Sequence, residues 1–359
     1  MAADASTTAA GFSRADRIGF ALAAITSIAA VAIRAGGASG PVVFAAAGVA
    51  VMVLAYILGE ATEQAGEAAG PRLAALLNAS FGNLPELIIV VLTIREGLID
   101  VARASIIGSV IGNVLLVLGA SILLGGIRNG PMRFDSRTVG TNASMLALAV
   151  VALGVPTLFA TLDGTTTHEQ EIVSYGVALI GLGLYIAYLI HSFQSPESVQ
   201  ADHPGSARWT TRSAVTVLAV AAVATGVMSE VLVSAIEPTI EDLGIGATFI
   251  GLVVVPLLGN VPEHWAAVRL ARGGDINFSM GIAFGSGLQV ALLGTAIAVL
   301  AGGVFGSPVE IVFPPIELAL LGAATLMTAI LATHGRTNWL EGLQLLTIYA
   351  IAALAFWFL

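Results

Sequence analysis

The sequence predicts an all-α polytopic membrane protein with about eleven transmembrane helices, arranged as one N-terminal helix plus two inverted five-helix repeats. Of the 359 residues, 57% are hydrophobic and only 10% are charged, whereas a soluble domain carries about a quarter charged residues. Eleven apolar runs are each long enough to cross a bilayer, which takes roughly 20 residues. The pattern Gly-Asn-x-Pro-Glu occurs twice, at 82–86 and 259–263, in corresponding places of two halves.

The apolar runs alternate with short connections that hold Gly, Pro, Asn or Arg, as loops between adjacent membrane helices do. The runs fall at about 17–34, 41–59, 72–94, 101–125, 138–160, 172–193, 213–236, 246–270, 276–301, 311–333 and 339–358.

The longest polar break, 195–212, divides the chain into a first span and two sets of five. A cleaved signal peptide is the alternative interpretation of 18–33, but this run is longer than a typical signal core. The expected divisions are an N-terminal tail and first transmembrane helix (1–36), a first five-helix repeat (41–193), a cytoplasmic linker (194–212) and a second, inverted five-helix repeat (213–359).

The placement of arginine predicts the orientation, because loops on the cytoplasmic side carry an excess of basic residues. With the N-terminus in the cytoplasm and the C-terminus outside, only Arg34, Arg95 and Arg103 face outward. The arginines that face inward are then Arg14, Arg17, Arg72, Arg128, Arg133, Arg137, Arg208, Arg212, Arg269, Arg272 and Arg336.

An odd number of spans in each set requires the second set to enter the membrane from the opposite face. Inverted repeats of this kind are the architecture of many secondary transporters. Two further matches support a duplication. The stretch 108–113 resembles 281–286, and Glu60 near the end of the second span corresponds to Glu230 in the seventh.

The residue types of the two motifs fit a site for a hard cation. Each proline removes a backbone donor and frees carbonyl groups in the preceding turn, and in hydrocarbon those groups must be satisfied. Carbonyl, amide and carboxylate oxygens are the ligands that Ca²⁺ prefers. The residues expected to bind the metal ion are Gly82, Asn83 and Glu86 in the first motif and Gly259, Asn260 and Glu263 in the second.

The same two carboxyl groups can couple the cation to protons. An ionised carboxylate at the bilayer centre costs roughly 2.5–3.5 kcal/mol on insertion scales, and two that face each other repel. Burial and like charge both favour the protonated form. We therefore expect Glu86 and Glu263 to hold protons when the site lacks a cation, and a divalent cation to displace them.

Other polar side chains near the motifs have a functional and a structural interpretation. His264 follows Glu263 and either relays protons or bonds a carbonyl of the next helix. Asn113, Ser286 and Gln289 lie on the helices that follow the motif helices, and either line the cavity or join helices by hydrogen bonds.

Glu60 and Glu230 are candidates for an entry pathway that concentrates cations, and the alternative is a solvated helix end. Glu63 and Glu67 continue the acidic stripe of Glu60, and for these two the solvated end is favoured.

Composition excludes several classes of enzyme and cofactor. The chain has no cysteine, and all 14 basic residues are arginine, so thiol catalysis, a zinc-thiolate site, a P-loop and a lysine nucleophile are absent. There is also no HExxH motif. We expect no enzyme activity, no cofactor and no nucleic-acid partner; the expected partners are Ca²⁺, H⁺ and the lipid bilayer. A homo-oligomer is compatible with the sequence, which does not fix the oligomeric state.

The doubled motif, Gly82 to Ile88 and Gly259 to His264, resembles the paired signature motifs of cation/proton exchangers of the CAX family, within the cation/Ca²⁺ exchanger superfamily. The resemblance extends from about Val42 to the C-terminus. It implies exchange of cytosolic Ca²⁺ for protons by alternating access, with Glu86 and Glu263 as the shared binding groups.

Two departures from the family pattern bear on this expectation. Val261-Pro262 stands where the family usually has two small residues, and the linker lacks the strongly acidic helix of many relatives. The short N-terminus favours a prokaryotic protein of the plasma (inner) membrane over a plant member with an autoinhibitory extension.

Three alternatives remain at this point. The chain could also be a Na⁺-coupled Ca²⁺ exchanger or a monovalent cation/H⁺ antiporter of the same superfamily, although His264 after the second motif points to the proton-coupled branch, and a pore with two buried carboxylates would make a cation channel. Ca²⁺ cannot be ranked against Mn²⁺, Mg²⁺, K⁺ or Na⁺ from residues alone.

Overall fold

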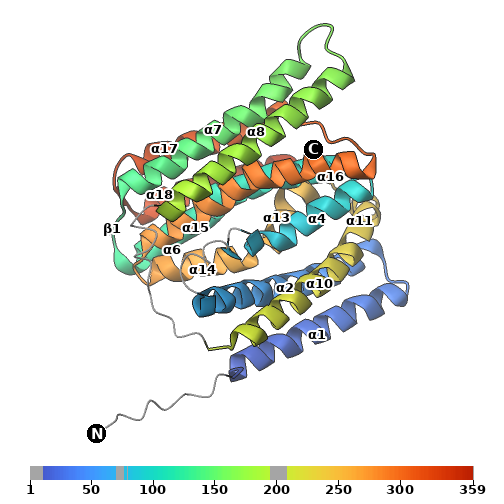
Figure 1. Cartoon of the computed structure of the whole chain (residues 1–359), viewed down its shortest axis with the longest axis vertical. Helices are drawn as coiled ribbons and strands as arrows, with labels where there is room; N and C mark the ends of the chain where they lie inside the picture. Colours follow the sequence, from blue (N-terminus) through green and yellow to red (C-terminus); the bar gives the residue numbers. More distant parts are fainter. Residues whose placement is uncertain (1–10, 70–76, 79, 195–207, 359) are drawn as a thin grey trace.

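Long helices run side by side through the whole molecule, and the loops gather at its two ends (Figure 1). The computed structural model describes residues 11–69, 77–78, 80–194 and 208–358. Most of the predicted tail and of the predicted linker, including Glu197 and Asp202, therefore lies outside the described residues, as does Arg72.

In the first half, within the ranges 11–69 and 84–194, the helical segments include one π-helical segment, η1. The segments are α1 (Arg14–Ala35), α2 (Gly40–Ala69), α4 (Leu84–Arg95), α5 (Ile99–Ile111), η1 (Gly112–Val117), α6 (Leu118–Asn129), α7 (Ser136–Ala160) and α8 (Thr167–Gln194).

The second half repeats the alternation of long and broken helices, with two π-helical segments, η2 and η3. Its segments are α10 (Thr211–Ser234), α11 (Ile236–Leu243), α12 (Ala247–Phe249), η2 (Ile250–Val254), α13 (Val255–Gly259), α14 (Val261–Arg272), α15 (Ile276–Leu288), η3 (Gln289–Gly294), α16 (Thr295–Phe305), α17 (Pro315–Ala332) and α18 (Trp339–Trp357).

The prediction of an all-α polytopic fold is confirmed, but the count of eleven spans is not. Nine helices of the described residues are long and apolar enough to cross a membrane, and ten if the bent pair 247–259 and 261–272 is one span. The predicted span 72–94 is described only from 77 on, without 79, and contains the short helix α4.

Two boundaries differ from the prediction for clear physical reasons. α2 continues to Ala69, beyond the apolar run, because its acidic stripe is also helical. α17 begins at Pro315 and not at 311, since residues 307–314 form neither helix nor strand. The backbone N–H groups of Ile311 and Phe313 donate to the hydroxyls of Ser174 and Thr157 at 2.9 and 3.0 Å in place of helical bonds.

A two-stranded ribbon joins loops from both halves. β1 (Met132–Arg133) pairs antiparallel with β2 (Arg336–Thr337). Nearby, the Asn129 side chain donates to the carbonyl of Ala271 at 3.0 Å. We call the end with this ribbon the arginine-rich end of the bundle, and the other the opposite end. The described arginines of the arginine-rich end are Arg14, Arg17, Arg128, Arg133, Arg137, Arg208, Arg212, Arg269, Arg272 and Arg336.

Two hydrophobic cores lie on either side of the motif helices. α1, α2 and α10 pack together along one edge of the bundle and form the smaller core, and we call them the three-helix unit (Figure 1). The remaining long helices form the larger core. Ile89 of α4 faces the smaller core and Val90 faces the larger. The motif helices therefore occupy the seam between two separately packed bodies.

A close crossing of the two halves lies beside this seam. Gly108 of α5 lies so near η2 that a Cβ atom there would be 2.1 Å from the carbonyl oxygen of Leu252. Reciprocally, a Cβ atom on Gly251 would lie 2.6 Å from the carbonyl oxygen of Val101. Any side chain at either position would force the backbones apart, so only glycine allows this approach.

Candidate functional site

Both motif helices break at the asparagine of the motif, with nearly the same backbone geometry. Asn83 has φ −98° and ψ 19°, and Asn260 has φ −104° and ψ 19°. The following segment restarts with proline in its first turn, where the missing N–H costs nothing. In the second half, the axis bends by 63° at this break. The sequence Asn-x-Pro thus ends one helix and begins another within the membrane-spanning region.

The break places each motif glutamate in the first turn of a new helix, near the positive end of the helix dipole. The Glu86 side chain is fully buried, with 0% exposure, whereas Glu263 is half-buried. The Glu263 carboxyl and the Asn260 amide both interact with the Glu86 carboxyl, but Asn260 does not reach hydrogen-bond geometry.

The two motifs touch directly through their backbones. A Cβ atom on Gly259 would lie 3.1 Å from Cβ and 3.3 Å from Cα of Glu86. Gly259 therefore brings the second motif against the first at the position of the buried carboxylate, and a larger residue would separate them.

A buried hydrogen-bond network joins the first motif to the second half of the chain. The Asn83 amide donates to Oε1 of Gln289 at 2.9 Å and accepts a bond from the Ser286 hydroxyl, also at 2.9 Å. The Asn113 amide donates to the same Ser286 oxygen at 3.0 Å. The three predicted cavity residues thus meet at the first motif, and Asn113 and Gln289 are positioned by the π-helical segments η1 and η3.

Several buried oxygen atoms at this meeting point have no hydrogen-bond partner among the described residues. They are both carboxyl oxygens of Glu86, Oε2 of Glu263, Oδ1 of Asn260 and Oδ1 of Asn113. Oxygen acceptors without donors are the ligands that a hard cation needs. In the described part of the chain, no group of three or more His, Cys, Asp and Glu side chains could hold a metal ion. A cation here would therefore need amide, backbone or water oxygens beside the two carboxylates.

The only hydrogen bonds that His264 makes to described residues come from its backbone. Its backbone N–H donates to the Asn260 carbonyl at 3.0 Å, as helical geometry requires. Its ring is half-buried, and no hydrogen bond from the ring to a described residue is observed. The predicted carbonyl bond is therefore missing within the described residues, and a proton relay stays a prediction.

The two pathway candidates lie at opposite ends of the bundle. Glu60 follows Gly59, which packs against the second motif: a Cβ atom on Gly59 would lie 3.1 Å from Cβ of Pro262. Glu60 pairs with Arg208 and lines a cavity of about 480 Å³ at the arginine-rich end, beside Glu63 and Glu67. Glu230 lies at the opposite end, with a 56% exposed side chain, and pairs with Arg95 at 3.1 Å. The apolar sequence around Glu230 therefore did not predict its surroundings, and neither arginine partner was singled out.

The chain matches the family model described as sodium/calcium exchanger protein over residues 39–194 and 213–358. It is 37% identical over 345 residues to the Ca²⁺/H⁺ antiporter of Synechocystis sp., covering 88% of this chain and 91% of that protein. It is 33% identical to the Ca²⁺/H⁺ antiporter ChaA of Bacillus subtilis, covering 89% of this chain and 92% of that protein.

Solved structures agree with these relatives. The structure of native YfkE superposes with a TM-score of 0.83 at 31% identity, over 95% of this chain and 100% of that one. The H⁺/Ca²⁺ exchanger CAX, at 17% identity, shares the fold with a TM-score of 0.75, over 96% of this chain and 89% of that one. Its apolar helices and these matches make the chain a multi-pass integral membrane protein, and it belongs to the sodium/calcium exchanger protein family.

Proposed function

We propose that this chain is a secondary active transporter that exchanges Ca²⁺ for protons across a membrane by alternating access. Glu86 and Glu263 bind the cation and the protons in competition. The observation that carries the proposal is the set of buried oxygen atoms without donors where the two broken helices meet. The activity named for its Synechocystis and Bacillus relatives supports the choice of Ca²⁺ and H⁺.

The oxygen set fits a divalent cation better than a proton alone. Ca²⁺ takes six to eight oxygen ligands, and carboxylates bind it through one or both oxygens. Glu86 and Glu263 supply the charge, and Asn260 and Asn113 supply neutral oxygens. Asn83 has its side-chain oxygen and nitrogen bonded to Ser286 and Gln289, so its role is to fix the break and not to bind the ion.

Protons compete because the empty site cannot keep both carboxylates ionised. Glu86 has no exposed surface and no hydrogen-bond donor among the described residues. An unpaired charge in such a place costs several kcal/mol. The empty site therefore holds protons, a divalent cation releases them, and only loaded forms change their access. This is why transport in one direction requires counter-transport.

We assign the two halves as inverted repeats, 41–193 and 213–359, that follow a first helix in 1–36 and are joined by the linker 194–212. Support comes from the equal geometry of the two breaks and from two separate matches to one family model. The arginine-rich end faces the cytoplasm of a prokaryotic cell, in accordance with the positive-inside rule. The N-terminus is then cytoplasmic and the C-terminus lies outside.

Reconstitution into liposomes tests the proposal directly. Addition of Ca²⁺ should release protons from loaded vesicles, and Glu86→Gln and Glu263→Gln should each abolish this release. Glu237→Gln, at an exposed position of α11, is the matched control and should leave it unchanged.

Other outcomes of these transport measurements would contradict the proposal. Full exchange in both motif variants would remove the carboxylates from the mechanism. Ca²⁺ uptake driven by a Na⁺ gradient and not by a pH gradient would favour a Na⁺-coupled exchanger. A signal with K⁺ and none with Ca²⁺ would identify a monovalent cation antiporter, and flux without any counter-ion would identify a channel.

A further inference from the structure

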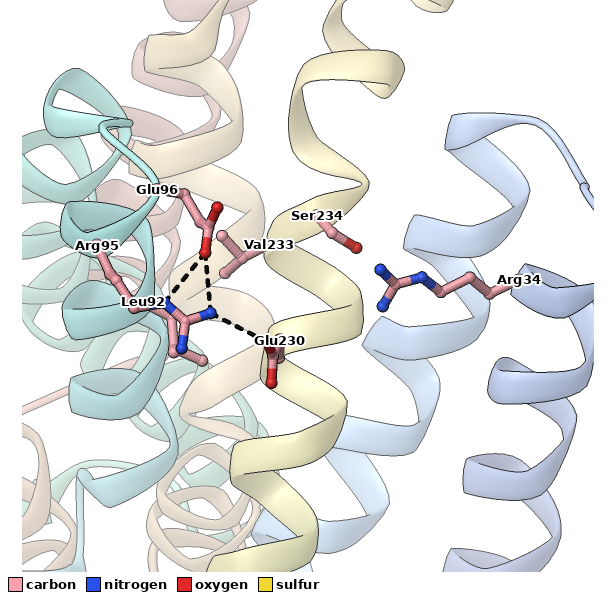
Figure 2. Close-up of a pocket in the computed structure, with 7 residues that line it drawn as sticks. All are labelled: Arg34, Leu92, Arg95, Glu96, Glu230, Val233 and Ser234. Atoms are coloured by element: carbon pink, nitrogen blue, oxygen red, sulfur yellow. Dashed lines mark hydrogen bonds and ion pairs between the residues drawn. The ribbon is translucent and has the colours of Figure 1, made fainter.

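A small pocket at the opposite end of the bundle lies between α1, α4 and α10 (Figure 2). Its volume is about 140 Å³, and Leu92 and Val233 contribute its apolar surface. The Arg95 guanidinium crosses the pocket and bonds Glu96 at 2.8 Å and Glu230 at 3.1 Å. The bond to Glu96 stays at the C-terminal end of α4, whereas the bond to Glu230 connects α4 with α10.

The Arg95–Glu230 ion pair crosses the seam between the two packed bodies. α4 carries Glu86 in its first turn and Arg95 in its last, and α10 belongs to the three-helix unit. The pair therefore stands over the stretch of seam that leads from Glu86 to the opposite end. It joins α4 to the three-helix unit at that end.

The second half contains the same elements at the arginine-rich end. Glu263 and Arg272 are nine residues apart (272 − 263), as are Glu86 and Arg95 (95 − 86). Both arginines end helices of 12 residues. Glu60 on α2 corresponds in sequence to Glu230 on α10.

The pair at the arginine-rich end is not formed in this structure. Glu60 bonds Arg208, which precedes α10 and so belongs to the same three-helix unit. Arg272 makes no ion pair with any described residue. A cavity of about 480 Å³ lies at this end, lined by residues of α1 and α2, by Arg208 and Trp209, and by Arg269 of α14. The ion pair that joins a motif helix to the three-helix unit is thus formed at one end and not at the other.

We propose that Arg95–Glu230 is a latch that closes the seam at the opposite end, and that Arg272–Glu60 is its counterpart at the arginine-rich end. The two latches alternate during transport. When Arg95 leaves Glu230, the path from Glu86 opens, and Arg272 displaces Arg208 from Glu60. The alternation of the two latches rests on the proposed transport function. The Arg95–Glu230 contact is independent of that proposal.

The exposure of the pair agrees with this role. The side chains of Arg95 and Glu230 are 39% and 56% exposed, so water screens their attraction. Exposed ion pairs of this kind shift an equilibrium by a small factor. Such a contact can therefore bias one state without preventing the other, as a latch that opens in every cycle must.

Thiol labelling tests the latch without requiring transport. The chain contains no cysteine, so Leu92→Cys places a single thiol in the pocket. A membrane-impermeant thiol reagent, added on the side of the membrane that the opposite end of the bundle faces, should react slowly with this parent variant. Adding Arg95→Gln or Glu230→Gln should raise the labelling rate about two- to fivefold, which is the range for a lost exposed ion pair. The charge exchange Arg95→Glu with Glu230→Arg should restore slow labelling.

The matched control is Asp100→Asn, which removes an ion pair of the same end that lies within α5 and does not cross the seam. Equal labelling rates in the parent and both latch variants, or an equal rise with Asp100→Asn, would overturn the proposal. Thermal unfolding of each variant verifies that labelling reports opening and not loss of fold.

A cross-link gives the second readout. Arg95→Cys with Glu230→Cys, joined by a bifunctional thiosulfonate reagent long enough to replace the two side chains, in a chain that keeps the Leu92 side chain, should stop Ca²⁺-dependent proton release, and a reductant should restore it. Undiminished release in the cross-linked protein would also overturn the latch. Failure of exchange in the unmodified protein would contradict the proposed function and leave the labelling result to decide on the latch.

Discussion

Replacing Gly259 by alanine tests the direct contact between the two motifs. The added methyl group would lie 3.1 Å from Cβ, 3.3 Å from Cα and 3.5 Å from the backbone nitrogen of Glu86. Carbon atoms in ordinary contact are about 3.5–4.0 Å apart, so the two motifs must separate by several tenths of an ångström. Overpacking of this size costs about 1–3 kcal/mol. If the cost falls on the loaded site, Ca²⁺ binding weakens about 5- to 150-fold.

The assay is the Ca²⁺ concentration that gives half-maximal proton release from proteoliposomes. Gly281→Ala is the matched control, because a methyl group at that position of α15 would meet nothing within 4 Å. We expect a raised half-maximal concentration for Gly259→Ala and an unchanged one for the control. Equal values for Gly259→Ala and the unmodified protein, at equal thermal stability, would refute the role assigned to this contact.

Two further predictions follow from the site. Asn83→Ala should lower both the thermal unfolding midpoint and the transport rate, since it removes two buried hydrogen bonds, to Gln289 and Ser286, each worth about 1–3 kcal/mol when one buried partner is removed. Thr157→Val, which removes the bonds of its hydroxyl to the N–H of Phe313 and the carbonyl of Ile311, should lower the midpoint and leave the half-maximal Ca²⁺ concentration unchanged. Lowering the pH on the side of Ca²⁺ addition should raise the half-maximal Ca²⁺ concentration by up to about tenfold per pH unit for each proton released, and a pH-independent value would contradict competition at Glu86 and Glu263.

The membrane fold and the broken helices could be predicted from the sequence, because each leaves a local mark. A proline after asparagine in an apolar run marks a break, and a lone amide in such a run marks a side chain that lines a cavity or joins helices. The bond from Asn83 to Gln289 could not be predicted. The two residues are 206 positions apart, and only the packing of the halves brings them together.

The arginine partners of Glu230 and Glu60 and the three π-helical segments could not be predicted from the sequence, for different reasons. Arg95 and Arg208 lie at helix ends, where many exposed charges are available to Glu230 and Glu60, and the choice among them depends on loop paths. The segments η1, η2 and η3 add a residue to a helical turn without changing the apolar character of the run. The only signal was the glycine within each of them.

The three-helix unit combines helices from both halves of the chain, and this constrains the order in which the protein folds during synthesis. α2 packs most extensively against α10, and α10 begins only at Thr211, after the whole first half has been synthesised. Proteins generally fold from the N-terminus as they emerge, but here α2 must wait in the bilayer with its polar and small residues uncovered. An isolated first half should therefore be a substrate for membrane quality control, and co-expression of a separate second half should protect it from degradation.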